Sequence, residues 1–183
     1  MTTLIIIGAL VLFGGFFIAV YNKLVRLKNM MQEGWSGIDV QLKKRYDLIP
    51  NLVNTVKGYA THEKEVFENV AAMRSVGINA KTIKEQEQAE NQITQALGRL
   101  FAVAENYPDL KANANFIDLQ KQLAQIEQDI QMARRYYNGT VRDNNITVES
   151  FPSNIVANMF SFKKGEYFEL ENSAERSAPT VQF

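Results

Sequence analysis

An uncharged apolar stretch near the N-terminus constrains this chain more than any other feature. It runs for eighteen residues from Leu4 to Tyr21, and no charged side chain precedes Lys23. As a helix rising about 1.5 Å per residue, it would span roughly 27 Å, close to the ~30 Å hydrocarbon core of a bilayer. The stretch therefore predicts a transmembrane anchor over residues 1–22.

A cleaved signal peptide is the competing interpretation of this stretch. Signal peptides carry a basic segment before the apolar one and small residues at the cleavage site. This chain begins with Met-Thr-Thr, and Ala19, near the end of the stretch, follows Phe17 and Ile18. We therefore expect an anchor that stays attached to the protein.

Positive charge is concentrated directly after the apolar stretch. Residues 22–60 carry seven cations and three anions, although the chain as a whole has 20 of each. Lys23, Arg26 and Lys28 are expected to form a basic collar at the membrane surface, which would also attract anionic lipid headgroups. By the positive-inside rule, the body of the protein would lie in the cytoplasm. An extracytoplasmic body is the alternative.

Three small residues of the anchor share one helix face. Gly8, Gly15 and Ala19 fall together at helical spacing. Small residues at such positions let membrane helices approach closely. They are candidate residues for packing between membrane helices, although glycine is common in spanning helices in any case.

Beyond the anchor, apolar residues recur every three or four positions, which is the period of amphipathic helices. Breaks fall around Asp47–Pro50, Gly77–Asn79 and Tyr107–Asp109, and Pro50 is expected to begin a new helix. Helices are therefore predicted over about 23–47, 50–76, 82–107 and 113–150. The first of them would continue the transmembrane helix without a break.

The last of these helices has a strict seven-residue repeat, which favours coiled-coil packing against partner helices. Its apolar positions are Phe116, Leu119, Leu123, Ile126, Ile130, Ala133 and Tyr137. We predict an all-α fold in which residues 23–150 form an antiparallel four-helix bundle. Residues 151–183 would form an irregular tail with a short helix over 155–160.

Composition excludes several classes of function. Zero net charge argues against a general nucleic-acid binder, and the absence of Cys excludes disulfides, thiol catalysis and Cys-ligated metals. His62, the single histidine, lies among hydrophilic residues without a second histidine nearby. No phosphate-binding loop or nucleophile elbow is found. We expect no enzymatic activity, no catalytic residues, no cofactor and no metal.

One polar cluster has two interpretations. Asp39, Arg45 and Asp47 lie close to Pro50, and Arg134 lies in the last helix. They are either surface ion pairs or an interhelical polar pin, since buried Arg–Asp pairs fix the register of helices at a desolvation cost.

The same residues carry a resemblance to a known family. The run from Trp35 to Val53, WSGIDVQLKKRYDLIPNLV, resembles the signature of the bacterial LemA family. Further matches are Glu105–Ala112, Arg134–Asn138 and Phe151-Pro152, so the resemblance covers about residues 21–183. It implies a single-pass bacterial membrane protein with a helical bundle, and it supplies no catalytic residues.

From these observations we expect a protein of the bacterial inner membrane that acts by interaction. The leading hypothesis is a scaffold that assembles with copies of itself beside the lipid bilayer. An adaptor or accessory subunit of another membrane protein complex is the alternative. A small-ligand sensor is a further one, and it would need a polar pocket around Asp39 and Arg45. Nucleic acid is not an expected partner.

Overall fold

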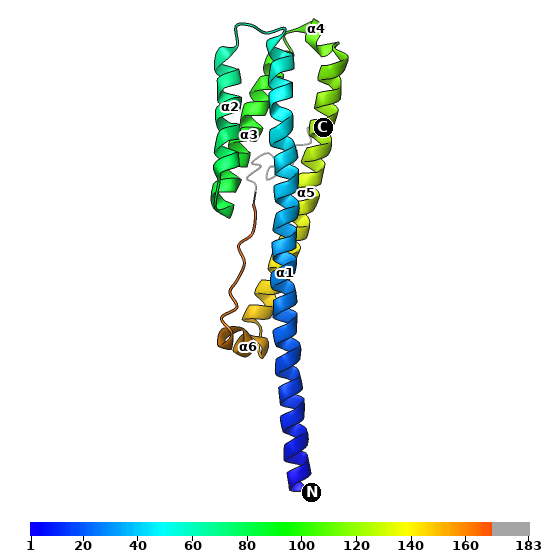
Figure 1. Ribbon diagram of the computed structural model, residues 1–183, viewed down its shortest axis with the longest axis vertical. Coiled ribbons are helices and arrows are strands. Elements are labelled where there is room, and N and C mark those ends of the chain that lie inside the picture. Colours follow the sequence, from blue (N-terminus) through cyan, green and yellow to red (C-terminus); the bar gives the residue numbers. More distant parts are fainter. Residues whose placement is uncertain (170–183) are drawn as a thin grey trace, which may run out of the picture. The chain divides into compact units, whose positions relative to one another are not determined.

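The computed structural model describes residues 1–169, and every regular element among them is a helix (Figure 1). The all-α prediction is confirmed for these residues, whereas residues 170–183 of the predicted tail lie outside them. The helices are α1 (Thr2–Lys57), α2 (Lys64–Asn79), α3 (Ile83–Ala104), α4 (Pro108–Lys111), α5 (Ala114–Glu149) and α6 (Ser153–Met159).

The chain folds into two compact units, and α1 and α5 each contribute to both. The first unit consists of residues 1–38 and 132–167, and the second consists of residues 39–131 with Phe168 and Glu169 among the described residues. The antiparallel four-helix bundle stays a prediction.

In the first unit, α6 packs against α1 (Figure 1). Leu24 of α1 and Val156 and Ala157 of α6 are fully buried together. At Gly34 a Cβ atom would lie 3.1 Å from the Cα of Tyr137, so the absence of a side chain lets α1 and α5 approach closely there.

An extended segment after α6 is held by polar side chains of α5. The Asn144 amide donates to the carbonyl of Lys163 at 3.1 Å. The Asn145 amide both donates to the carbonyl of Gly165 at 3.0 Å and accepts from its N–H at 2.8 Å. Both asparagines are buried, and these bonds satisfy them. Residues 162–167 have no regular secondary structure, and these bonds fix their path along α5.

In the second unit, α2 and α3 pack against each other. Helix α3 begins with a capping box, in which Thr82 Oγ1 accepts from the Glu85 N–H at 3.1 Å and the Glu85 carboxylate accepts from the Thr82 N–H at 3.2 Å. The apolar stripe of α3 is buried, and its members include Ile93, Leu97 and Leu100. These buried apolar side chains of α3 form part of the apolar core of the second unit.

The predicted helix break at Asp47–Pro50 is wrong, because α1 continues through Pro50 to Lys57. Proline has no N–H, so the carbonyl four residues earlier loses its helical partner. That carbonyl belongs to Tyr46, and it accepts a hydrogen bond from Arg74 Nε of α2 at 2.7 Å. The helix tolerates the proline because a side chain from α2 replaces the missing donor.

Other helix boundaries also differ from those predicted. The helix predicted over 50–76 does not exist as one element, because residues 50–57 belong to α1 and α2 starts at Lys64. The helix predicted over 82–107 ends at Ala104 and is followed by the short α4. The expected helix over 155–160 is found as α6, two residues earlier at its start.

We expect Arg74→Ala to lower the free energy of unfolding by about 1–3 kcal/mol, because it leaves the Tyr46 carbonyl without a partner. The cost should be smaller when Pro50→Ala is also present, since alanine restores the helical N–H to that carbonyl. A double-mutant cycle of urea unfolding in mild detergent, followed by circular dichroism, measures the coupling. Equal costs of Arg74→Ala in both backgrounds would contradict this explanation.

Candidate functional site

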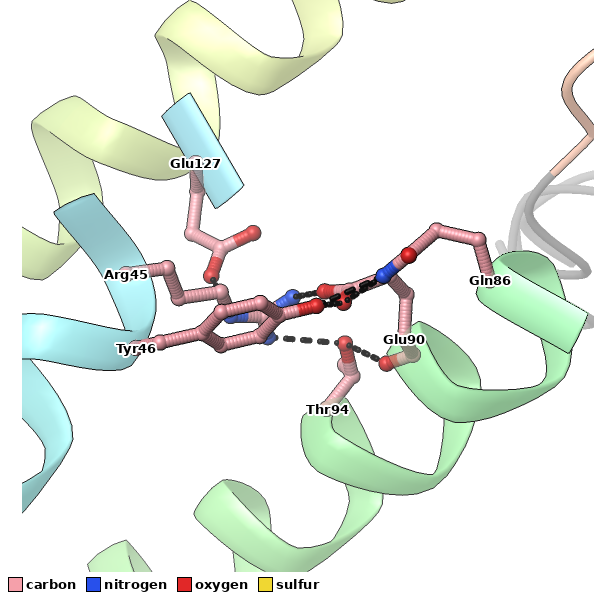
Figure 2. A network of polar contacts seen from close by, with 6 residues as sticks. All are labelled: Arg45, Tyr46, Gln86, Glu90, Thr94 and Glu127. Atoms are coloured by element: carbon pink, nitrogen blue, oxygen red, sulfur yellow. Dashed lines mark hydrogen bonds and ion pairs between the residues drawn. The ribbon is translucent and has the colours of Figure 1, made fainter. Parts of the chain in front are cut away.

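A buried arginine connects three helices in the second unit (Figure 2). Arg45 of α1 is 2% exposed. Its NH1 group lies 2.8 Å from Glu90 Oε2 of α3, and its NH2 group donates to Thr94 Oγ1 at 2.9 Å. Its Nε atom is 2.9 Å from Glu127 Oε1 of α5. One guanidinium therefore holds α1, α3 and α5 together.

The second oxygen of Glu90 is satisfied separately. The Tyr46 hydroxyl donates a short hydrogen bond to Glu90 Oε1. Gln86 Nε2 donates both to the same oxygen, at 2.9 Å, and to the Tyr46 hydroxyl, at 2.6 Å. Glu90 itself is completely buried. Its charge is thus compensated by one cation, Arg45, and two neutral donors, Tyr46 and Gln86, as a buried carboxylate requires.

The two carboxylates around Arg45 are in different environments. Burial raises the pKa of Glu127, the positive charge of Arg45 lowers this pKa in part, and the negative charge of Glu90 raises it again. Burial also raises the pKa of the Tyr46 hydroxyl, and the charge of Glu90 adds to that increase. Glu127 is 37% exposed and Glu90 is 0% exposed, so Glu90 is the main counterion of Arg45.

The other residues of the predicted polar pin lie elsewhere. Asp39 and Asp47 line a concavity together with Tyr46, and they are not partners of Arg45. Burial raises the pKa of Asp39. Arg134 belongs to the first unit. Arg45 therefore pairs with the glutamates Glu90 and Glu127, and the expected Arg–Asp pairs are not formed.

Glu90 and Gln86 were missed by the sequence analysis, although a signal for them exists. Both occupy the same three- and four-residue stepping as the apolar stripe of α3, which runs through Ile83, Gln86, Glu90, Ile93, Leu97, Leu100 and Ala104. A carboxylate at a core position of an amphipathic helix needs a buried cation. Arg45 of α1 is that cation.

A glycine makes room for this network. At Gly77 of α2, a Cβ atom would lie 2.7 Å from the Tyr46 hydroxyl, which is too close for any other residue without a shift of Tyr46. The predicted break at Gly77–Asn79 coincides with the end of α2 at Asn79, and Gly77 itself lies in the last turn of the helix. Its structural role is the close approach to Tyr46.

The predicted basic collar is divided between two faces of α1. Lys23 and Arg26 line a concavity that also contains Asp143. Lys28 lines a different concavity, together with Lys163 from the segment after α6. The structure thus does not bring the three collar residues together.

The apolar stretch of α1 is exposed almost throughout. Exposed fractions of its large side chains include 74% at Leu4, 77% at Leu12 and 62% at Phe13. The backbone at Gly8 and Gly15 has nothing within 4 Å of the position of a Cβ atom, and Ala19 is exposed. Helix α1 is long and apolar enough to cross a membrane, with a mean hydropathy of 2.7 in its most apolar window.

Comparison with known proteins identifies the family. The sequence model described as the LemA family matches residues 34–183. The chain belongs to the LemA family. The resemblance seen in the sequence is thereby confirmed, and the exposed apolar stretch of this LemA-family chain supports a location at a membrane.

Curated relatives agree with this assignment. The chain is 26% identical over 188 residues to the magnetosome protein MamQ 2 of Paramagnetospirillum magneticum, covering 88% of this chain and 69% of the relative. The magnetosome protein MamQ of Magnetospirillum gryphiswaldense is 22% identical with the same coverage. Protein LemA of Metamycoplasma hominis is 28% identical over 148 residues, covering 78% of this chain and 68% of the relative.

Glu90→Gln should lower the free energy of unfolding by about 3–5 kcal/mol, because it leaves Arg45 buried without its main counterion. Urea unfolding at neutral pH, followed by circular dichroism in mild detergent, measures the loss. A cost below about 1 kcal/mol, typical of a surface pair, would show that Glu90 is not the main counterion.

Glu127→Gln is the matched control, with an expected cost of about 1 kcal/mol or less because Glu127 is partly exposed. Since the folded state raises the pKa of Glu127, it binds that proton more tightly than the unfolded state does. The contribution of Glu127 to stability therefore falls as the pH rises through the folded pKa. The stability of the wild type relative to Glu127→Gln should therefore decrease as the pH rises above about 4, the ordinary pKa of a glutamate.

Proposed function

We propose that this LemA-family chain is a membrane-anchored helical scaffold that acts through protein–protein interaction and assembles with copies of itself. The observation that carries the proposal is the continuity of α1 from Thr2 to Lys57. The same helix supplies the exposed apolar stretch and the arginine around which the second unit is built. We propose no catalytic activity for the chain.

Self-assembly is proposed through the small-residue face of the anchor, defined by Gly8, Gly15 and Ala19. The backbone at both glycines is open in this structure. In lipid, helices associate by close packing because lipid tails are as apolar as leucine, and small residues permit that packing. A second copy of α1 is the proposed neighbour.

The names of two relatives give a context for this proposal. The MamQ proteins are named as magnetosome proteins. For this chain we propose a corresponding role in holding other molecules at a membrane. An accessory subunit of another membrane complex is the alternative function.

We expect Gly15→Ile to reduce the native mass of the protein extracted from its own membrane in mild detergent, because the β-branched side chain blocks close helix packing. Gly14→Ile is the matched control, since Gly14 lies about 100° around the helix from Gly15 and off the small-residue face. Native mass spectrometry of the wild type and both variants measures the assembly.

The outcomes of this experiment separate the two functions. Loss of mass in Gly15→Ile alone supports self-assembly through this face, and equal masses in all three proteins contradict it. A particle that contains a second polypeptide in fixed ratio, unaffected by Gly15→Ile, identifies an accessory subunit instead.

For the orientation, we propose a cytoplasmic body, supported by Lys23, Arg26 and Lys28 directly after the apolar stretch. The chain lacks Cys, so a single exposed Lys121→Cys provides a clean label. We expect an impermeant thiol reagent to label Lys121→Cys only after the membrane has been permeabilised. Labelling in intact spheroplasts would place the body outside the cytoplasm.

A further inference from the structure

A concavity in the first unit joins a basic end to an apolar end. The concavity has a volume of about 650 Å³, and the residues of its basic end are Lys28, Asn29 and Gln32 of α1 together with Lys163. Tyr21 and Phe160 also line it, and the same two side chains form an adjoining apolar groove with Phe17 and Ile18. We call the whole feature the Lys28–Lys163 cleft.

The end of α6 builds the aromatic wall of this cleft. Ser161 adopts a left-handed conformation with φ of 56°. The N–H of Phe162 then bonds to the carbonyl of Ala157 at 2.9 Å, and the N–H of Ser161 bonds to the carbonyl of Asn158 at 3.2 Å. These two bonds form a Schellman motif, which reverses the chain at the helix end.

The reversal places two aromatic rings against α1. The ring centroid of Phe160 lies 4.7 Å from that of Tyr21, and the centroid of Phe162 lies 5.8 Å from it. The wall is fixed by the buried Leu24 cluster and by the hydrogen bond from Asn144 to the Lys163 carbonyl. The cleft is therefore preformed.

The position of the cleft along α1 matches the edge of a bilayer. The apolar groove lies beside Phe17–Tyr21, the last turn of the apolar stretch. Lys28 follows Tyr21 by seven residues, about 10 Å along a helix, and the headgroup region on each side of a bilayer is about 5–7 Å deep. The lysine side chain is long and flexible and can place its amine several ångströms from its Cα atom. The Lys28 amine can therefore reach the headgroup region.

Helix α6 presents apolar side chains toward solvent at the same level. Ile155 is 48% exposed, Met159 62% and Phe160 51%, while the opposite face of α6 packs on α1. An amphipathic helix of this kind, beside a spanning helix, buries its apolar face at the boundary between headgroups and acyl chains. The apolar groove therefore opens toward lipid.

The charge of the cleft selects an anion. Lys28 and Lys163 are its two cations, and no carboxylate is found among the described residues that line it. The neighbouring cation Lys164 is paired with Glu149. Asn29 and Gln32 add uncharged amide groups that can donate to oxygen atoms.

We propose that the Lys28–Lys163 cleft binds one anionic phospholipid, with the headgroup phosphate between Lys28 and Lys163 and an acyl chain along Phe17, Tyr21 and Phe160. A soluble anion would use only the basic end, whereas a phospholipid uses both ends at once. The proposal rests on the membrane location of α1 and does not require self-assembly.

The test compares two pairs of substitutions with equal change of charge. Full-length protein is reconstituted in vesicles of phosphatidylcholine with a minority of phosphatidylglycerol, extracted in mild detergent, and examined by native mass spectrometry for retained lipid. Lys28→Gln with Lys163→Gln removes the cations of the cleft. Lys23→Gln with Arg26→Gln removes two cations from the other concavity of the same membrane-proximal region.

We expect the wild type to retain one phosphatidylglycerol per chain in preference to phosphatidylcholine. The Lys28→Gln, Lys163→Gln protein should lose this retention by roughly tenfold or more, since each cation near a membrane contributes to anionic lipid binding. The Lys23→Gln, Arg26→Gln protein should retain lipid as the wild type does. Circular dichroism melting checks that both variants stay folded, as expected for exposed side chains.

Three results would overturn the proposal. Equal losses in the two double variants would indicate a general basic collar without a site. Absence of preferential retention by the wild type would exclude the site. Displacement of the lipid by millimolar inorganic phosphate would assign the cleft to a soluble anion. The same spectra report the oligomer mass, so failure of self-assembly is distinguished from failure of lipid binding.

Discussion

The buried charge of Arg45 is the constraint around which the second unit is arranged. A guanidinium that is 2% exposed must recover from its neighbours the interactions that it loses in water. It does so through Glu90 and Thr94 of α3 and Glu127 of α5, so the register of three helices is fixed by one side chain. An apolar core alone tolerates sliding of helices, whereas these directional hydrogen bonds and ion pairs favour one register of the helices.

Contacts between residues distant in sequence also set how much of the fold could be predicted. The periodicity of the apolar residues was sufficient to identify α3 and α5, because a long amphipathic pattern has few alternatives. It failed at Pro50, since the donor that replaces the missing N–H comes from Arg74, which is distant in sequence. It also failed to pair Arg45 with Glu90, because the expected partners were chosen from acidic residues close to Arg45 in the chain.

The membrane-proximal residues illustrate a second limit of prediction. Lys23, Arg26 and Lys28 follow the apolar stretch closely in sequence, which suggested one collar. The helical turn separates them onto different faces of α1, and the packing of α6 gives Lys28 a new neighbour, Lys163. Charge counted along the sequence shows only which residues follow the apolar stretch. The side chains that share a local environment are determined by a segment more than one hundred residues later.

Side chains of α5 hold the segment after α6 by hydrogen bonds to its backbone. Asn144 and Asn145 bind the carbonyls of Lys163 and Gly165 and one N–H, and the Tyr137 hydroxyl binds the carbonyl of Glu166 at 2.8 Å. Peptide groups are common to all residues, so these bonds do not restrict the side chains of Lys163, Lys164 or Glu166. The path of the segment is thus set by peptide groups and is independent of the chemistry of these three side chains. Other side chains at positions 163, 164 and 166 are compatible with the same path of the chain, so the charge of this surface and the fold beneath it are separate properties.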